Sequence, residues 1–185
     1  MTYKNKIVRD LESVIFSPDL LKSNENIEDV LFKIPKDEID LFLLELDKYP
    51  DDIINFIGDR KSYRLGKYFE ALLKFYFIWN RKVELVANSV QVFEAKITLG
   101  EMDFILKDLN TEEYIHLEVA VKFFARNADL LSAFEYKCPD GQRNLGQKLD
   151  KTFSKQIRIT DKHQTKELLK KKGIDKINKK LYIKG

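Results

Sequence analysis

The sequence predicts a mixed α/β domain whose core runs helix, three strands, helices and a last strand, preceded by a helical extension. Two observations indicate this order. With 185 residues, of which 44% are hydrophobic and 34% charged, the chain has enough apolar residues to bury one core. Apolar residues recur at helical spacing up to residue 80, change to strand-like runs, and return to helical spacing after residue 144.

Short helices are predicted for residues 4–58, because their apolar residues recur at helical spacing in three groups. The groups are Ile7 to Ile15, Ile27 to Leu31 and Ile39 to Leu46. Prolines at positions 18, 35 and 50 separate them, since a residue before proline avoids helical geometry. We assign residues 1–60 to a helical extension that packs on the core or docks a protein partner or a second copy of the chain. Residues 61–185 form the main domain.

A longer helix is predicted from Ser62 to about Asn80. One apolar stripe marks it, formed by Leu65, Phe69, Leu72, Leu73, Tyr76 and Phe77. Ser62 is a candidate N-cap residue. Gly66 disfavours a helix by up to about 1 kcal/mol relative to Ala, so we expect a close packing contact at this position.

Three strands are predicted after this helix, because β-branched and aromatic residues dominate the next segments. The segments are 83–93, 102–106 and 114–123, with a turn at 109–112 between the last two. Helical spacing resumes with Leu145, Leu149 and Phe153, and again over 163–172, where Gly173 fits the helix stop. Residues 180–184 are the final predicted strand. The chain ends almost at this strand, so it could be a fragment of a longer protein.

The composition argues against several classes of protein. No apolar run reaches the roughly 18 residues of a membrane span, and the start of the chain lacks the apolar stretch and cleavage site of a signal peptide. These features predict a soluble, cytoplasmic protein that has no membrane partner. Cys138, His116 and His163 are the only cysteine and histidines and provide no zinc-type ligand set. A metal site must therefore use carboxylates.

Charge is distributed unevenly along the chain. Residues 137–185 carry 15 Lys and Arg against 5 Asp and Glu, whereas residues 1–136 carry 18 against 25. A basic block of this size attracts polyanions, nucleic acid first, because neutralised phosphates release counterions. The alternative is a well-solvated surface in a lysine-rich protein.

Three carboxylates fall in the most regular part of the pattern: Glu70 in the long helix, Asp103 in the second strand and Glu118 in the third. Residues two apart in a strand share a face, so His116 and Lys122 lie on the face of Glu118. Carboxylates in apolar strands need a partner when buried. A divalent cation such as Mg²⁺ or Mn²⁺ suits an oxygen-only site; otherwise Glu118 and Lys122 form a solvent-facing pair. His116 could assist catalysis or simply be hydrogen-bonded.

Four segments resemble a known group of enzymes. Residues 99–104 (LGEMDF) and 116–123 (HLEVAVKF) resemble the core motif of the PD-(D/E)XK nuclease superfamily, which includes restriction endonucleases and Holliday-junction resolvases. Together with residues 64–70 (RLGKYFE) and 147–151 (QKLDK), they are similar, in this order, to an uncharacterised bacterial domain-of-unknown-function family grouped with these nucleases. The resemblance spans residues 60–183.

The resemblance implies a restriction-endonuclease-like α-β-β-β-α-β core and metal-dependent hydrolysis of phosphodiester bonds. Asp103 and Glu118 would bind Mg²⁺ or Mn²⁺, and Glu70 would contribute from the first core helix. Glu101 would add an outer or second-metal contact, unless it is a rim carboxylate exposed to water. Gln147 would orient a water or a phosphate, unless it belongs to an ordinary polar helix face.

The lysine of the motif is displaced in this chain. In the common pattern it stands two residues after the second acid, where this sequence has Ala120. Lys122 is the nearest basic residue on the same face, but its Cα lies roughly 13 Å from that of Glu118 in a regular strand, so a bulge or twist must bend the strand. Three alternatives stay open: Lys122 acts from its displaced position, a lysine such as Lys148 replaces it, or the site binds nucleic acid without cutting it.

Basic side chains follow the third strand and are candidates for phosphate contacts, which position a polymer without reading its sequence. They are Arg143, Lys148, Lys151, Lys155 and Arg158. Together with these residues, the resemblance implies a nuclease acting on DNA or, second, RNA, with Glu70, Asp103, Glu118 and Lys122 as catalytic residues. The alternatives are a binding module without catalysis on the same fold and a protein-interaction domain that uses the acidic extension.

Overall fold

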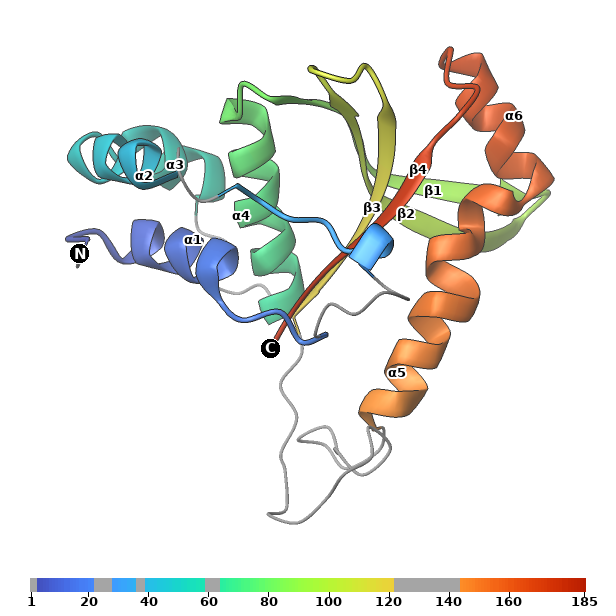
Figure 1. The fold of residues 1–185 in the computed structure, drawn as a ribbon, viewed down its shortest axis with the longest axis horizontal. Coiled ribbons are helices and arrows are strands. Elements are labelled where there is room, and N and C mark those ends of the chain that lie inside the picture. The colour runs from blue at the N-terminus through green and yellow to red at the C-terminus, as the bar shows by residue number, and fades with distance from the viewer. Residues whose placement is uncertain (1–2, 22–27, 36–38, 59–63, 122–143) are drawn as a thin grey trace.

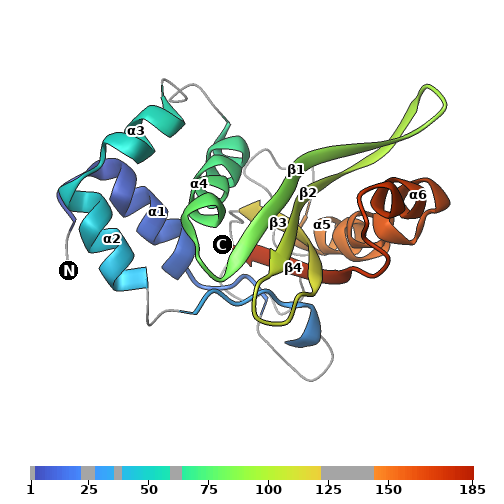
Figure 2. The same ribbon diagram turned by 90° about the horizontal axis from the view of Figure 1, so that it is seen from above.

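The structure is a computed structural model that describes residues 3–21, 28–35, 39–58, 64–121 and 144–185 (Figure 1). A four-stranded mixed sheet lies at its centre, with strand order β1-β2-β3-β4. Helices cover both faces of the sheet, α1 to α4 on one side and α5 and α6 on the other (Figure 2). The predicted mixed α/β class is therefore confirmed.

The four strands run where the change of period predicts them. They are β1 (Val83–Glu94), β2 (Ile97–Asp108), β3 (Tyr114–Val121) and β4 (Asn178–Lys184). β1, β2 and β3 pair antiparallel, whereas β4 pairs parallel to β3. A parallel neighbour requires a crossover connection, and the helices before β4 belong to this crossover. They are α5 (Leu145–Lys151), the π-helix η3 (Thr152–Gln156), the 3₁₀ helix η4 (Ile157–Asp161) and α6 (His163–Lys171).

The N-terminal part forms α1 (Lys6–Phe16), α2 (Ile39–Lys48) and α3 (Asp51–Ile57). The helix predicted around Ile27–Leu31 is wrong within the described residues, where only the single 3₁₀ turn η1 (Glu28–Val30) is found. Ile27 itself lies outside them. The backbone after η1 pairs with β4 instead: Leu31 bridges Leu181, and the Phe32 N–H donates to the Leu181 carbonyl at 2.8 Å.

The helices α1, α2 and α3 share one apolar cluster with α4 and the sheet. Leu11, Leu43, Ile53 and Leu72 are fully buried in this cluster, together with Leu117 of β3. The helical extension therefore packs on the core, as one of the two predicted roles requires. Whether it also docks a partner stays a prediction. No helix within the described ranges is long and apolar enough to cross a membrane.

The long helix is α4 (Leu65–Trp79), close to its predicted bounds. The predicted N-cap, Ser62, lies outside the described residues. A Cβ added at Gly66 would meet no described atom within 4 Å beyond its own helix, so the predicted packing contact is not found among the described residues. Gly100 of β2 is the glycine with a close neighbour, because a Cβ there would lie 2.5 Å from Ile159 Cδ1. Because Gly100 has no side chain, Ile159 of η4 packs directly against the backbone of β2.

Local interactions end β2 and α6. The Asp108 carboxylate accepts the N–H groups of Asn110 and Thr111 at 2.8 and 3.0 Å, which closes the predicted turn between β2 and β3. Gly173, with φ of +75°, follows α6 in the left-handed conformation that commonly ends a helix. Both features were predicted from the local sequence.

Replacing Gly66 with Ala is expected to raise the free energy of unfolding by about 0.5–1 kcal/mol, because Ala restricts the unfolded chain and no neighbour obstructs the new methyl group. Urea denaturation of both proteins measures the change. Gly100→Ala is the matched control and is expected to lower stability, since Ile159 must move. A lower stability for Gly66→Ala would contradict the open space at this position.

Candidate active site

Five of the predicted site residues, three acids and two lysines, line one cavity. Glu70 of α4, Asp103 of β2 and Glu118 of β3 surround a volume of about 200 Å³. Lys148 and Lys151 of α5 line it as well. Because α4 and α5 lie on opposite faces of the sheet (Figure 2), residues from both helix layers meet at this point.

The two strand carboxylates lie where β2 and β3 stop pairing. The backbone ladder between these strands ends at Phe104 and Leu117. Asp103 and Glu118 form the next opposite pair, and opposite residues of antiparallel strands point to the same face. In place of a main-chain carbonyl, Asp103 Oδ2 accepts the backbone N–H of Val119 at 2.9 Å. The strands therefore open at the site, and a carboxylate bridges the opening.

Burial raises the pKa of Asp103 from 3.8 to about 8. The negative charge of Glu118 adds to this rise, as do those of Glu70 and Glu101, whereas the hydrogen bond from the Val119 N–H opposes it. The cluster thus holds more negative charge than its surroundings stabilise. A bound cation would compensate that charge.

Lys67, one turn before Glu70 on α4, partly neutralises the cluster. Its Nζ lies 2.6 Å from Glu70 Oε2 and 3.9 Å from Glu101 Oε1. The hydrogen bond to Glu70 raises the pKa of Lys67, and the charges of Glu70, Glu101 and Asp103 add to the effect. Glu101 thus lies beside the cavity and contacts Lys67, which sequence reasoning did not single out although it belongs to the RLGKYFE segment.

Both oxygens of Glu118 are held by hydrogen bonds. Glu118 is only 3% exposed, and its Oε1 lies 2.8 Å from Nε2 of the fully buried His116. The two groups are thus at hydrogen-bond distance inside the protein. The other oxygen, Oε2, accepts from Gln156 Nε2 at 3.3 Å. His116 and Gln156 therefore fix the orientation of Glu118.

Gln156 was missed by the sequence prediction, which assumed regular helix over 145–156. The helix changes to π winding at Thr152–Gln156, a geometry that is frequent at functional sites. The Thr152 hydroxyl donates to Gln156 Oε1 at 3.0 Å, which orients the amide toward Glu118. The only local signal was two polar residues four apart, and such pairs are common on helix surfaces.

The other predicted contact residues lie outside this cavity. Gln147 caps α5: its Oε1 accepts the Asn144 N–H at 3.3 Å, and its own N–H donates to Asn144 Oδ1 at 2.8 Å. Lys155 and Arg158 are exposed on η3 and η4. The predicted site residues Lys122 and Arg143 lie outside the described residues.

The donors at the cavity suit a hard divalent cation, since every one of the three acids offers oxygen. Asp103 and Glu118 would hold it, with Glu70 as a third ligand. The described residues contain no preassembled group of three His, Cys, Asp or Glu side chains in metal-binding geometry. Because Glu70 is paired with Lys67, a cation at this site would compete with Lys67 for the Glu70 carboxylate.

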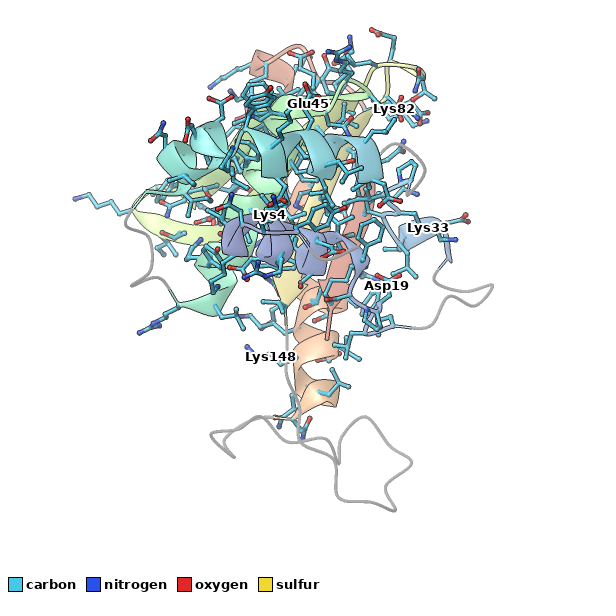
Figure 3. The ribbon with its side chains drawn as sticks, turned by 90° about the vertical axis from the view of Figure 1, so that its left-hand side faces the viewer. Lys4, Asp19, Lys33, Glu45, Lys82 and Lys148 are labelled. Atoms are coloured by element: carbon cyan, nitrogen blue, oxygen red, sulfur yellow. The ribbon has the colours of Figure 1, made fainter. Side chains whose placement is uncertain are left out.

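A larger hollow of about 780 Å³ lies toward the C-terminal end of α4. Aromatic side chains such as Phe42, Tyr76 and Trp79 line it, and Glu45 and Lys82 belong to its lining. Figure 3 shows Glu45 and Lys82 at the end of the molecule away from Lys148. Its described lining includes none of the predicted site residues. We therefore place the candidate active site in the smaller cavity.

Comparison with known proteins gives one match. The model of a family described as "Domain of unknown function (DUF1853)" matches residues 9–185. No curated protein and no solved structure matches significantly.

In metal-free buffer, replacing Asp103 with Asn is expected to raise the melting temperature at pH 8 and to change it little at pH 4. The raised pKa of about 8 means that the native protein keeps a proton that the unfolded chain loses above about pH 4. Stability therefore falls as the pH rises from about 4 to 8, and Asn removes that loss. We expect a gain of at least about 1 kcal/mol, or roughly 2–4 °C, at pH 8.

Thermal unfolding at both pH values measures this effect. Asp175→Asn, which removes an exposed carboxylate in the loop after α6, is the control and should change the melting temperature by at most roughly 1–2 °C. Mg²⁺ should stabilise the parent protein more than the Asp103 variant. A variant destabilised at pH 8 relative to pH 4 would contradict the repulsive cluster.

Proposed function

We propose that this chain, which belongs to the DUF1853 family, is a metal-dependent phosphodiesterase that hydrolyses nucleic acid, with DNA as the first expected substrate and RNA as the second. The observation that carries the proposal is the meeting of Glu70, Asp103 and Glu118 around one cavity. Two of these acids come from neighbouring strands at the point where the strands separate. Such a set of oxygens would bind a hard cation, and the cation would bind a phosphate of the substrate.

The order of the elements supports the same proposal. Along the chain, α4, β1, β2, β3, α5 and β4 follow one another, which agrees with the α-β-β-β-α-β order that the PD-(D/E)XK resemblance implies. The acids lie in the second and third strands, as that resemblance expects. We therefore propose a restriction-endonuclease-like core for residues 61–185.

Each residue of the site then has a role. Asp103 and Glu118 would hold a Mg²⁺ or Mn²⁺ ion, which would polarise a phosphate oxygen and make a water more acidic. His116 and Gln156 hold Glu118 in one orientation through its two oxygens. Glu70 completes the set of acids, and Lys67 balances their charge while no substrate is bound.

The missing lysine of the motif is replaced from α5 in this proposal. Ala120, at the usual place of that lysine, lines the cavity, and Lys148 and Lys151 line the same cavity. We assign Lys148 to stabilise negative charge on the reacting phosphate. Lys151, Lys155 and Arg158 would bind flanking phosphates, which strengthens binding without sequence preference. Lys122 stays a prediction, because it lies outside the described residues.

Incubation of the purified protein with DNA and RNA oligonucleotides in Mg²⁺ or Mn²⁺ tests the activity. We expect cleavage that EDTA abolishes and that Asp103→Asn and Glu118→Gln each reduce by at least about 100-fold, since each removes a metal ligand. Asp175→Asn should retain full activity. Cleavage that persists in the Asp103 variant would show that another site or a contaminating enzyme is responsible.

Separate variants of the basic residues test the assignment of Lys148. Lys148→Ala is expected to lower kcat by about 10- to 100-fold with a small change in KM, because its charge acts on the transition state. Lys155→Ala and Arg158→Ala should mainly raise KM and reduce its salt dependence. If Lys122→Ala lowers kcat and Lys148→Ala does not, the displaced strand lysine is the catalytic one.

Ala120 also favours a second candidate function, a nucleic-acid-binding module without catalysis. This candidate expects binding that weakens steeply with salt and no cleavage in any metal. Fluorescence anisotropy with labelled oligonucleotides at two salt concentrations distinguishes the two functions. Absence of any binding would exclude both.

A further inference from the structure

The cavity that holds the carboxylates has a second, apolar wall. Its aliphatic side chains come from α5, from β4 and from the segment after α1: Leu145, Leu149, Leu181, Ile183 and Leu20. Leu181 and Ile183 are buried, and Leu20 and Leu149 pack on them in one cluster with Ile157. The Leu20 N–H donates to the Ile183 carbonyl at 3.0 Å, which holds Leu20 against β4. The apolar wall is therefore a packed part of the fold.

The two walls of the cavity suit different parts of a ligand. Phosphate needs cations or hydrogen-bond donors, and these lie on the polar side, where Lys148 and Lys151 face the acids that would hold a cation. Aliphatic side chains offer a phosphate nothing, but they gain free energy when they cover an apolar surface. A nucleotide has one anionic end and one flat, largely apolar base. Its two ends match the two walls.

We propose that the apolar wall binds the base of one unpaired nucleotide, so that the substrate is single-stranded nucleic acid or an unpaired end. This inference rests on the proposed phosphodiesterase. In a duplex, bases are stacked and paired, and only groove edges, sugars and phosphates reach the surface. Enzymes whose site must contact a base act on single strands or turn the base out of the stack.

The size of the cavity agrees with a single nucleotide. Its volume of about 200 Å³ is below the roughly 300–1,000 Å³ of ordinary small-molecule sites. The phosphate would lie at the cation held by Asp103 and Glu118, and the adjoining base at the half-buried side chains of Leu149 and Leu20.

The wall also predicts weak base preference. The cavity lining drawn from the described residues contains no aromatic ring, and the Gln156 amide is already bonded to Glu118 and Thr152. Because the described aliphatic side chains that would contact the base carry no donor or acceptor, we expect discrimination between bases to be small. Cleavage of homopolymers of the four bases should differ by no more than about tenfold.

The experiment compares one oligonucleotide as a single strand, as a blunt duplex and as a duplex with an unpaired overhang, in DNA and RNA forms and in Mg²⁺. We expect the single strand and the overhang to be cleaved at least about tenfold faster than the paired region. Leu149→Ala should raise KM for the single strand by about 3- to 10-fold and leave kcat nearly unchanged. Leu109→Ala, an exposed leucine in the turn after β2, is the control and should change neither.

A binding measurement keeps this inference separate from the proposed function. Anisotropy of a labelled 15-residue thymidine oligonucleotide and of its duplex is measured for the parent and for Leu149→Ala. If the parent protein prefers the single strand and Leu149→Ala reduces this preference, the apolar wall is supported. This holds even if nothing is cleaved, in which case only the proposed catalysis fails. Equal or faster cleavage of the duplex, or equal losses on both substrates, overturns the inference and leaves the phosphodiesterase standing.

Discussion

The hydrogen bond from the Val119 N–H to Asp103 is the constraint on which the candidate site depends. β2 and β3 are antiparallel neighbours, and continued pairing would close the space between them. The ladder stops at Phe104 and Leu117, while β3 goes on pairing with β4 as far as Val121. The Asp103 carboxylate satisfies a donor of β3 that β2 no longer reaches, so the Val119 N–H stays paired where the strands separate.

This separation explains the charge pattern of the chain. The opening brings Asp103 and Glu118 together, and Glu70 of α4 lies at the same cavity. All three acids belong to the acidic part of the sequence. The basic part supplies α5 and the helices after it, which lie on the other face of the sheet (Figure 2). Lys148 and Lys151 thereby meet the acids across one cavity. The acidic and basic parts of the sequence therefore both contribute side chains to this cavity, because the crossover before β4 places the basic segment against the sheet.

Local pattern was sufficient for part of this structure. The two-residue period places Glu118 and His116 on one face, and the structure joins them at 2.8 Å; the stop at Gly173 also follows from local chemistry. Pairing between distant segments left no such signal. Leu31 and Leu20 bond to the edge of β4, so the second predicted helix is reduced to a turn and a leucine enters the cavity. The π winding of η3 is equally invisible to a 3.6-residue period, and it is what selects Gln156 for contact with Glu118 while Gln147 caps α5.

The acids of the site differ in how firmly they are held, and this difference matters for a cation. Asp103 is tied to β3 through Val119, and Glu118 is bonded on both oxygens by residues of two elements. Glu70 is bonded to Lys67, whose side chain is 58% exposed, and an exposed ion pair of this kind contributes little free energy. Breaking it therefore costs little. In the proposed function, two preoriented carboxylates would receive the cation, and Glu70 would exchange its pairing with Lys67 for the cation, while Lys67 would keep Glu101 as a neighbour at 3.9 Å.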